Sequence, residues 1–181
     1  CVEPYTGLVP VGHVRLNSGE LWFTRTEGTE EMNKDKLRQE LAEDEGCKYE
    51  IYLDHLGLPT FGIGHLVVED DPEHGQPVGT AVDEERVRQV FSLDIASTLD
   101  ECQVLYPDFD DLPEEAQLII ANMMFNMGRP RLSKFKGMKA GVDAKDWNRA
   151  ADEMVDSRWY DQVTNRAKRL VARMRAIEDT A

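Results

Sequence analysis

The chain has 181 residues, 41% of them apolar, and a formal net charge of −14, which allows one sizeable hydrophobic core and argues against general disorder. The excess of acidic residues argues against nonspecific binding to nucleic acid or to an anionic membrane. No apolar run approaches the roughly 18 residues of a membrane helix, and no basic segment followed by an apolar one predicts a signal peptide.

The cysteines and histidines show no spacing that is typical of a metal site. The cysteines are three in number and lack Cys-x-x-Cys spacing, so we expect neither a disulfide scaffold nor zinc. His13, His55 and His74 have no ligand-like spacing either, and we therefore predict no metal.

Residues 1–31 differ in composition from the rest and are predicted to be an N-terminal extension. Residues 14–23 have the pattern of a small hairpin around an Asn-Ser-Gly turn, and residues 26–31 are typical of a linker. Because a lone two-stranded ribbon is barely stable in water, this segment docks on the body, belongs to a larger assembly or was added to the native chain. We expect residues 32–181 to form the folded domain.

The first predicted helix begins after Asn33, a residue type that caps helix N-termini. Leu37 and Leu41 lie one turn apart on its apolar face. Gly46 predicts its end, so the helix delivers Glu45 at its C-terminus.

Residues 51–63 are rich in β-branched and aromatic residues and are broken by Gly57 and Pro59, a pattern that predicts a hairpin. Proline in a strand favours a sheet edge. A carboxyl at a helix end (Glu45) and another on the neighbouring hairpin (Asp54) can face each other across a groove. Such a pair suits glycoside cleavage, in which an acid protonates the leaving oxygen and a carboxylate acts on the opposite face of the sugar.

The remaining chain is predicted to be helical after an acidic loop at residues 67–80. Apolar residues keep helical spacing over residues 83–105, and the run at residues 118–125 is apolar nearly all round, which is typical of a helix buried on every side. Shorter helices are predicted at residues 146–155, 158–160 and 165–177. The predicted fold class is α+β, with a small antiparallel sheet lobe joined to a larger helical lobe.

The segment at residues 164–175 carries five positive charges and no acid. Such a basic helix on an acidic body could bind an anionic polymer such as cell wall. The alternative, which we favour, is a solvated helix face that completes a charge network.

Three separated segments resemble the phage-type lysozymes of glycoside hydrolase family 24. They are D-E-G…Y-L-D…P-T-F-G-I-G-H, N-M-M-F-N-M-G and S-R-W-Y-D-Q-V-T-N-R-A-K-R, in consistent order over residues 33–177. The resemblance implies a lysozyme-like fold with a cleft between the lobes. It also implies hydrolysis of the peptidoglycan β-1,4 bond between N-acetylmuramic acid and N-acetylglucosamine, without a cofactor.

By this resemblance Glu45 is the general acid, while Asp54 and Thr60 position the attacking water and the anomeric carbon is inverted. Glu45 must then be protonated near neutrality, which requires burial against apolar groups. Asp54 needs a polar, hydrogen-bonded environment that keeps it ionised. Structural alternatives are a turn residue for Asp54 and an ordinary strand residue for Thr60.

The resemblance also assigns residues that support the site. His65 pairs with Asp94 as an ion pair between the lobes; the alternative is that His65 acts as a base. Arg166 lies beside Glu45 and Asp44, where its charge opposes protonation of Glu45 and has to be balanced by burial and by Asp44.

Leu66, Phe125 and Asn126 match positions that line the saccharide cleft, although Phe125 is equally compatible with a core position. Asn126 stands where the family often has glutamine. Met138 and Glu153 occupy positions that often carry serine and asparagine for sugar binding, so those contacts are in doubt for this chain.

The leading hypothesis is a monomeric peptidoglycan muramidase of a bacteriophage. It is either an endolysin, which resides in the host cytoplasm before its release to the periplasm, or a module of the virion tail with tail proteins as partners. One alternative is a lysozyme-like module that only binds glycan or protein. Another is a lytic transglycosylase, which uses Glu45 alone and yields anhydro-sugars.

Overall fold

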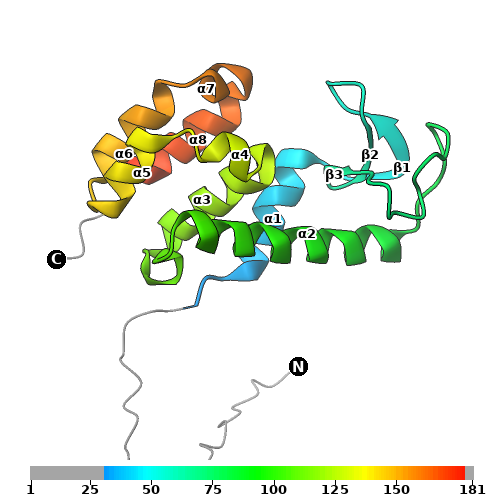
Figure 1. Cartoon of the computed structure of the whole chain (residues 1–181), viewed down its shortest axis with the longest axis horizontal. Helices are drawn as coiled ribbons and strands as arrows, with labels where there is room; N and C mark the ends of the chain where they lie inside the picture. Colours follow the sequence, from blue (N-terminus) through cyan, green and yellow to red (C-terminus); the bar gives the residue numbers. More distant parts are fainter. Residues whose placement is uncertain (1–30, 178–181) are drawn as a thin grey trace, which may run out of the picture.

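The computed structural model describes residues 31–177, so the predicted hairpin and most of the linker lie outside the described residues, and the domain boundary at residue 32 stays a prediction. The α+β class is confirmed: a helical lobe lies on one side and a small sheet on the other, with α1 and α2 running between them (Figure 1). The elements are α1 (Lys34–Glu45), β1 (Lys48–Leu53), β2 (Pro59–Gly62), β3 (His65–Leu66), α2 (Glu84–Leu105), the 3-10 helix η1 (Phe109–Asp111), α3 (Glu114–Met127), α4 (Arg129–Leu132), α5 (Lys136–Asp143), α6 (Trp147–Val155), α7 (Arg158–Gln162) and α8 (Thr164–Arg175).

Helix α1 begins and ends at the predicted residues. The side chain of Asn33 accepts hydrogen bonds from the backbone N–H groups of Asp35 and Lys36, which have no partner inside the helix. Gly46 has a φ of 72°, a conformation that glycine adopts without steric cost, and it stops the helix directly after Glu45.

The sheet is antiparallel with the order β1-β2-β3. Thr60 of β2 pairs with Tyr52 of β1 on one side and with Leu66 of β3 on the other. The prediction of an edge strand from Pro59 is therefore wrong, because β2 is the central strand. Pro59 is tolerated there because it is the first residue of its strand.

Helix α2 joins the two lobes. Val87 and Val90 in its first half pack with Ile51 and Phe61 of the sheet in a small core. Its second half, from Phe91 onward, belongs to the larger core of the helical lobe. The two halves of one uninterrupted helix thus serve two hydrophobic cores.

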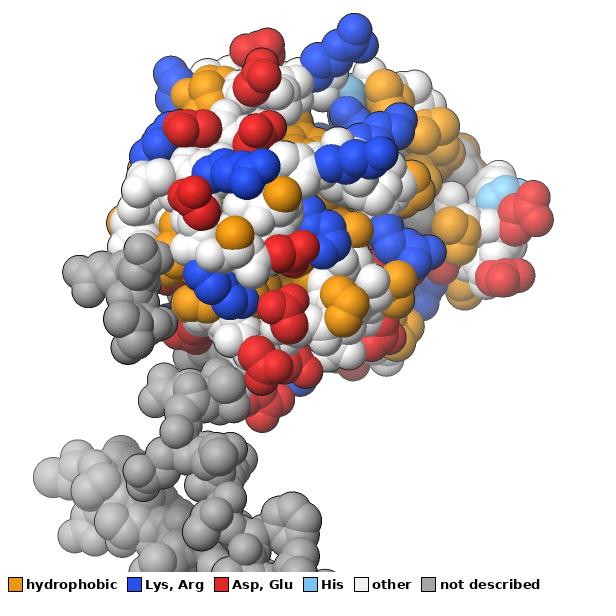
Figure 2. Space-filling model, turned by 60° about the vertical axis from the view of Figure 1, so that its left-hand side comes forward, with side chains coloured by type: hydrophobic (Ala, Val, Ile, Leu, Met, Phe, Trp, Pro, Cys, Tyr) orange, Lys and Arg blue, Asp and Glu red, His pale blue; other side chains and the backbone are white. Residues whose placement is uncertain are grey.

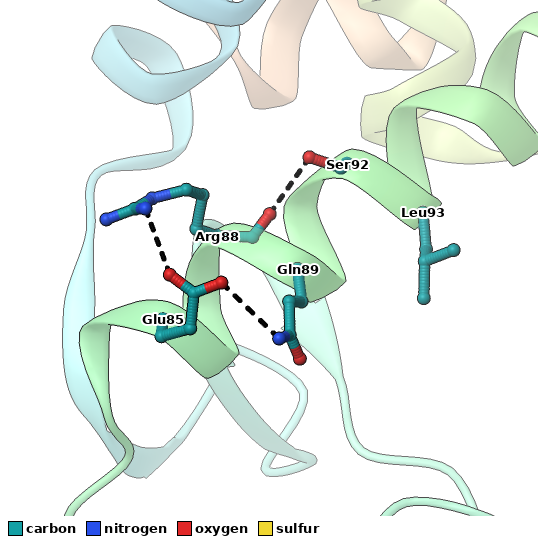
Figure 3. Close-up of a pocket in the computed structure, with 5 residues that line it drawn as sticks. All are labelled: Glu85, Arg88, Gln89, Ser92 and Leu93. Carbon is teal, nitrogen blue, oxygen red and sulfur yellow. Dashed lines mark hydrogen bonds and ion pairs between the residues drawn. The ribbon is translucent and has the colours of Figure 1, made fainter.

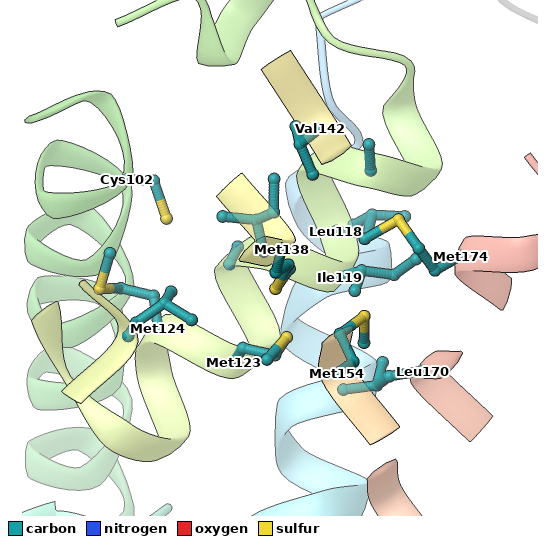
Figure 4. Close-up of a cluster of buried hydrophobic side chains, with 14 of the residues drawn as sticks. Cys102, Leu118, Ile119, Met123, Met124, Met138, Val142, Met154, Leu170 and Met174 are labelled. Carbon is teal, nitrogen blue, oxygen red and sulfur yellow. The ribbon is translucent and has the colours of Figure 1, made fainter. Parts of the chain in front are cut away.

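Helix α3 is the centre of the helical lobe, as its apolar sequence predicts. Every residue from Ala116 to Met124 is buried. Figure 4 shows methionines of four helices gathered in one cluster, and their flexible side chains fill irregular space between the helices. They are Met123 of α3, Met138 of α5, Met154 of α6 and Met174 of α8.

The arginines of α8 take part in a charge network, in agreement with the favoured interpretation. Arg173 lies 2.9 Å from Glu40 and 2.8 Å from Glu115, and Arg175 pairs with Asp152. Figure 2, with the helical lobe turned forward, shows Lys and Arg side chains interspersed with Asp and Glu. None of the helices within residues 31–177 is both long and apolar enough to cross a bilayer.

Helices α5 and α6 pack closely at two glycines, which differ in what a methyl group would meet. A Cβ on Gly141 would lie 2.7 Å from the backbone nitrogen of Ala150, whereas the three atoms nearest to a Cβ on Gly137 all belong to the side chain of Glu153, whose flexible end can move away. We expect Gly141→Ala to destabilise the fold by about 1–3 kcal/mol through overpacking.

Gly137→Ala is the matched control on the same helix and is expected to be neutral or slightly stabilising, because alanine is the better helix former. Urea denaturation of both variants measures the difference. Equal stabilities of the two variants would contradict the close backbone contact at Gly141.

Candidate active site

Glu45 lies where the helical lobe meets the sheet. Its Oε1 is 2.6 Å from Nη1 of Arg166, which belongs to α8. On the other side, a Cβ built on Gly64 would lie 3.1 Å from Oε2. The glycine between β2 and β3 therefore allows the backbone of the sheet to approach the carboxylate closely, and the side chain is only 21% exposed.

Arg166 is buried, and each of its three guanidinium nitrogens has a hydrogen-bond partner. Its Nε donates to Oδ1 of Asn122 at 2.8 Å, and its Nη2 donates to the Asn122 backbone oxygen at 3.3 Å. Asn122 in turn donates to Oδ2 of Asp44 at 3.0 Å, and Arg169 bonds the other oxygen of Asp44. Arg166 Nε also lies 3.6 Å from Asp44, so its charge is shared between two carboxylates.

Asp54 and Thr60 are both engaged in the turn between β1 and β2. Oδ1 of Asp54 accepts from the backbone N–H groups of Leu56 at 2.8 Å and Leu58 at 2.9 Å. The hydroxyl of Thr60, which is buried, donates to the Leu58 carbonyl at 3.1 Å. The turn role that the sequence offered for Asp54 is therefore present.

Tyr52 connects these residues. It pairs with Thr60 across β1 and β2. Burial raises the pKa of its phenol, and the negative charges of Glu45 and Asp54 raise this pKa further.

His65 bonds a carboxylate at each ring nitrogen, Asp94 at 2.8 Å from Nδ1 and Asp71 at 2.9 Å from Nε2. Arg86 extends the network to Asp71 and, with two bonds of 2.9 Å, to Glu73. Burial lowers the pKa of His65, but the hydrogen bonds and charges of the two aspartates outweigh it, so that the pKa lies above its ordinary value. With neither ring nitrogen free, the geometry favours the structural role of His65 over that of a base.

The three residues predicted to contact sugar occupy different environments. Leu66 is 44% exposed and pairs with Thr60. Phe125 is half-buried and meets Phe91 edge to face, with ring centroids 6.0 Å apart. The Oδ1 of Asn126 accepts from Nε1 of Trp159 at 2.8 Å, which ties α3 to α7. Their contact with substrate, and the cleft itself, stay predictions.

Met138 and Glu153 are the two positions at which the sequence left sugar contact in doubt. Met138 is completely buried and therefore not available to a sugar. Glu153 is exposed on α6, and its carboxylate lies against α5 at Gly137.

A surface depression on α2 does not compete with this site. Its lining residues all come from one face of that helix (Figure 3). Its polar groups bond mainly to one another, as Arg88 does to Glu85 at 2.9 Å. The depression contains none of the predicted site residues; it is lined by Glu85, Arg88, Gln89, Ser92 and Leu93.

Sequence reasoning missed Asn122, Arg169 and Tyr52. A signal was present for Asn122, because it is a polar residue inside an otherwise apolar helix and such a residue needs hydrogen-bond partners when buried. Arg169 had no comparable signal, since it is one of several cations on α8. Tyr52 follows the alternation of an ordinary strand, so its neighbours become visible only in the fold.

The chain is similar in sequence to known lysozymes. A family model described as phage lysozyme matches residues 42–177. A protein of Dictyostelium discoideum named probable T4-type lysozyme 2 is 28% identical over 155 residues, which cover 75% of this chain and 91% of that protein.

Two longer phage proteins also match. The pre-baseplate central spike protein Gp5 of Enterobacteria phage T4 is 26% identical over 152 residues, which cover 74% of this chain but 26% of that protein. The peptidoglycan hydrolase gp36 of Pseudomonas phage phiKMV is 29% identical over 169 residues, which cover 92% of this chain and 18% of that protein. The match thus spans only a small part of these two relatives. The phage lysozyme model matches well over half of the residues of this chain. The chain therefore belongs to the phage lysozyme family.

Proposed function

We propose that this chain, a lysozyme-type glycosidase by its family, cleaves the peptidoglycan β-1,4 bond between N-acetylmuramic acid and N-acetylglucosamine with inversion. The observation that supports this best is the close approach of the sheet to Glu45 at Gly64, since the same small sheet carries Thr60 and its strand β1 ends at the Asp54 turn. Two carboxyl groups and a hydroxyl near one another are the groups that inverting hydrolysis needs.

In the proposed reaction the carboxylic acid of Glu45 gives its proton to the glycosidic oxygen while the bond from that oxygen to the anomeric carbon breaks. A water held by Asp54 and Thr60 attacks the anomeric carbon from the opposite face. Its proton passes to the Asp54 carboxylate, and exchange with solvent restores both acids. Inversion requires the two carboxyl groups to be about 6.5–9.5 Å apart, which leaves room for the water.

The ion pair to Arg166 is the main electrostatic obstacle, since a cation favours the ionised form of Glu45. Two features reduce the effect of the Arg166 cation on Glu45. Asp44 and Asn122 share the guanidinium with Glu45. Arg166 also bonds Oε1, so Oε2, on the side of Gly64, is the oxygen that we assign to the transferred proton.

The test is digestion of purified peptidoglycan, with the new chain ends identified by mass spectrometry and the anomeric configuration followed by NMR. We expect reducing muramic acid ends that are first released as the α anomer. Anhydro ends would show that the enzyme is a transglycosylase and not a hydrolase. Retained anomeric configuration would exclude the role of Asp54 and Thr60. An absence of cleavage would indicate a module that only binds.

The match to a phage central spike protein supports a second setting for the same chemistry. As a module of a virion tail, the chain would open the wall locally and contact tail proteins. As an endolysin, it would act as a monomer that moves from the host cytoplasm to the periplasm and causes lysis. Co-purification with virions, detected by antibody, distinguishes a tail component from an enzyme found only in the lysate.

A further inference from the structure

The proposed mechanism does not use Tyr52, although this residue stands directly opposite the proposed catalytic threonine in the sheet. Tyr52 is half-buried on β1 and stands opposite Thr60 of β2. Directly opposed residues in an antiparallel pair project from the same face of the sheet, with their Cβ atoms about 5 Å apart. Tyr52 therefore shares its face with the threonine that is proposed to hold the water.

Lys48 restrains the ring of Tyr52. The register of β1 against β2 shifts between Lys48 and Tyr52, and Nζ of Lys48 lies 4.2 Å from the centroid of the tyrosine ring. At this distance an ammonium group is attracted by the negative face of the ring. The interaction holds the ring in one orientation without occupying its hydroxyl.

The two acids already have other hydrogen-bond donors. Glu45 accepts a hydrogen bond from Arg166, and Asp54 accepts hydrogen bonds from two backbone N–H groups of its own turn. Burial, with Glu45 and Asp54 adding to it, raises the pKa of the Tyr52 phenol, so the phenol stays neutral and can donate a proton in a hydrogen bond.

We propose that Tyr52 is a substrate-contacting residue whose hydroxyl donates a hydrogen bond to the glycan between Glu45 and Asp54, and that Lys48 positions its ring. This inference rests on the proposed glycosidase function. It adds a neutral donor to a site whose other groups are an acid, a carboxylate and a threonine.

Tyr49 offers a matched control on the same strand. It is 50% exposed, and the groups that raise its pKa are Cys47 first and, more weakly, Glu84 of α2. Neither predicted acid contributes, so the two phenols have different surroundings. We expect Tyr52→Phe to lower the turnover of peptidoglycan about tenfold, the effect of losing one hydrogen bond made in the transition state. Tyr49→Phe should retain the wild-type rate.

The role of Lys48 is tested by a pair of variants. Lys48→Met removes the charge and should lower turnover, whereas Lys48→Arg should restore it because guanidinium also stacks on aromatic rings. Melting temperatures of all four variants should match the wild type. Equal turnover of Lys48→Met and Lys48→Arg would remove Lys48 from the proposal.

An NMR titration separates the failure of this inference from the failure of the proposed function. Soluble N-acetylglucosamine oligomers are added to the protein with ring-labelled tyrosine, and the signals are assigned with the two phenylalanine variants. We expect the Tyr52 signal to shift and the Tyr49 signal to stay. Turnover of Tyr52→Phe equal to that of Tyr49→Phe overturns the proposal. If the wild type cleaves no peptidoglycan, the titration decides alone, and an unmoved Tyr52 signal overturns it.

Discussion

Glu45→Gln is expected to fold like the wild type and to lose about 10²–10⁴-fold in turnover of peptidoglycan, the usual contribution of a general acid. The amide keeps the size of the side chain and retains an oxygen that can accept from Arg166, which lies 2.6 Å from Oε1. It has no acidic proton to give to the leaving oxygen. The rate is measured as release of soluble muropeptides, and the fold by circular dichroism and thermal melting.

Glu43→Gln is the matched control, since Glu43 lies on the same helix and is exposed, and among the described residues its Oε1 accepts a hydrogen bond only from Gln39, one turn earlier. The control variant should retain the wild-type rate. Wild-type-like turnover of Glu45→Gln would refute the assignment of the acid. Loss of the melting transition would instead show that the bond to Arg166 needs a full negative charge.

Asp94→Asn is expected to lower the free energy of unfolding by about 1–3 kcal/mol near pH 6. Loss of one partner of a buried pair costs more than this, but the Asp94 side chain is 28% exposed and solvent screens part of the interaction. For a domain of this size the change corresponds to a fall of roughly 3–10 °C in melting temperature. Asp100→Asn, an exposed position on the same helix, should leave the melting temperature unchanged.

The pH dependence follows from the directions of the shifts. The pKa of His65 is raised above 6.5, so its contribution to stability is complete below that value and is lost as pH rises through the folded pKa. The pKa of Asp71 is lowered below 3.8 despite its burial, mainly because it accepts from Val68 and His65. Its contribution is therefore complete above 3.8 and is lost as pH falls through the folded pKa. The network stabilises most between these values.

Melting curves of the wild type and Asp94→Asn at several pH values check this prediction. The difference between them should shrink as the pH rises through the folded pKa of His65, because the imidazole then loses the charge that pairs with Asp94. A difference that is constant with pH would show that Asp94 stabilises the fold without its charge.

The helices were predictable because their apolar residues recur with helical spacing and their ends carry strong local signals. Asn33 and Gly46 each fix a helix end by a property of the residue itself. Helices α4 and α5 were missed. They have 4 and 8 residues, too few for a clear periodicity, and α5 contains two glycines, which weaken a helix prediction.

The sheet was predicted less well. A single proline suggested an edge strand, yet Pro59 begins the central strand β2. The third strand has only the two residues His65 and Leu66. So short a segment forms a strand only because β2 offers pairing partners. The local sequence does not indicate this pairing.

The predicted site residues came from the resemblance and the spacing of acids, but their partners required the fold. Asn122 and Arg166 are 44 residues apart and meet at the carboxylates of Asp44 and Glu45. Similarly, the family resemblance implied Asp94 as the partner of His65, and the structure adds Asp71 and Arg86. Such contacts depend on how α1, α3 and α8 pack, which no short segment encodes.

The double membership of α2 has a mechanical consequence. Val90 faces the core of the sheet lobe and the next residue, Phe91, faces the core of the helical lobe. An α-helix is stiff because each residue adds a backbone hydrogen bond. A glycan that widens the space between the lobes therefore has to bend α2 elastically or tilt it against one of the two hydrophobic cores.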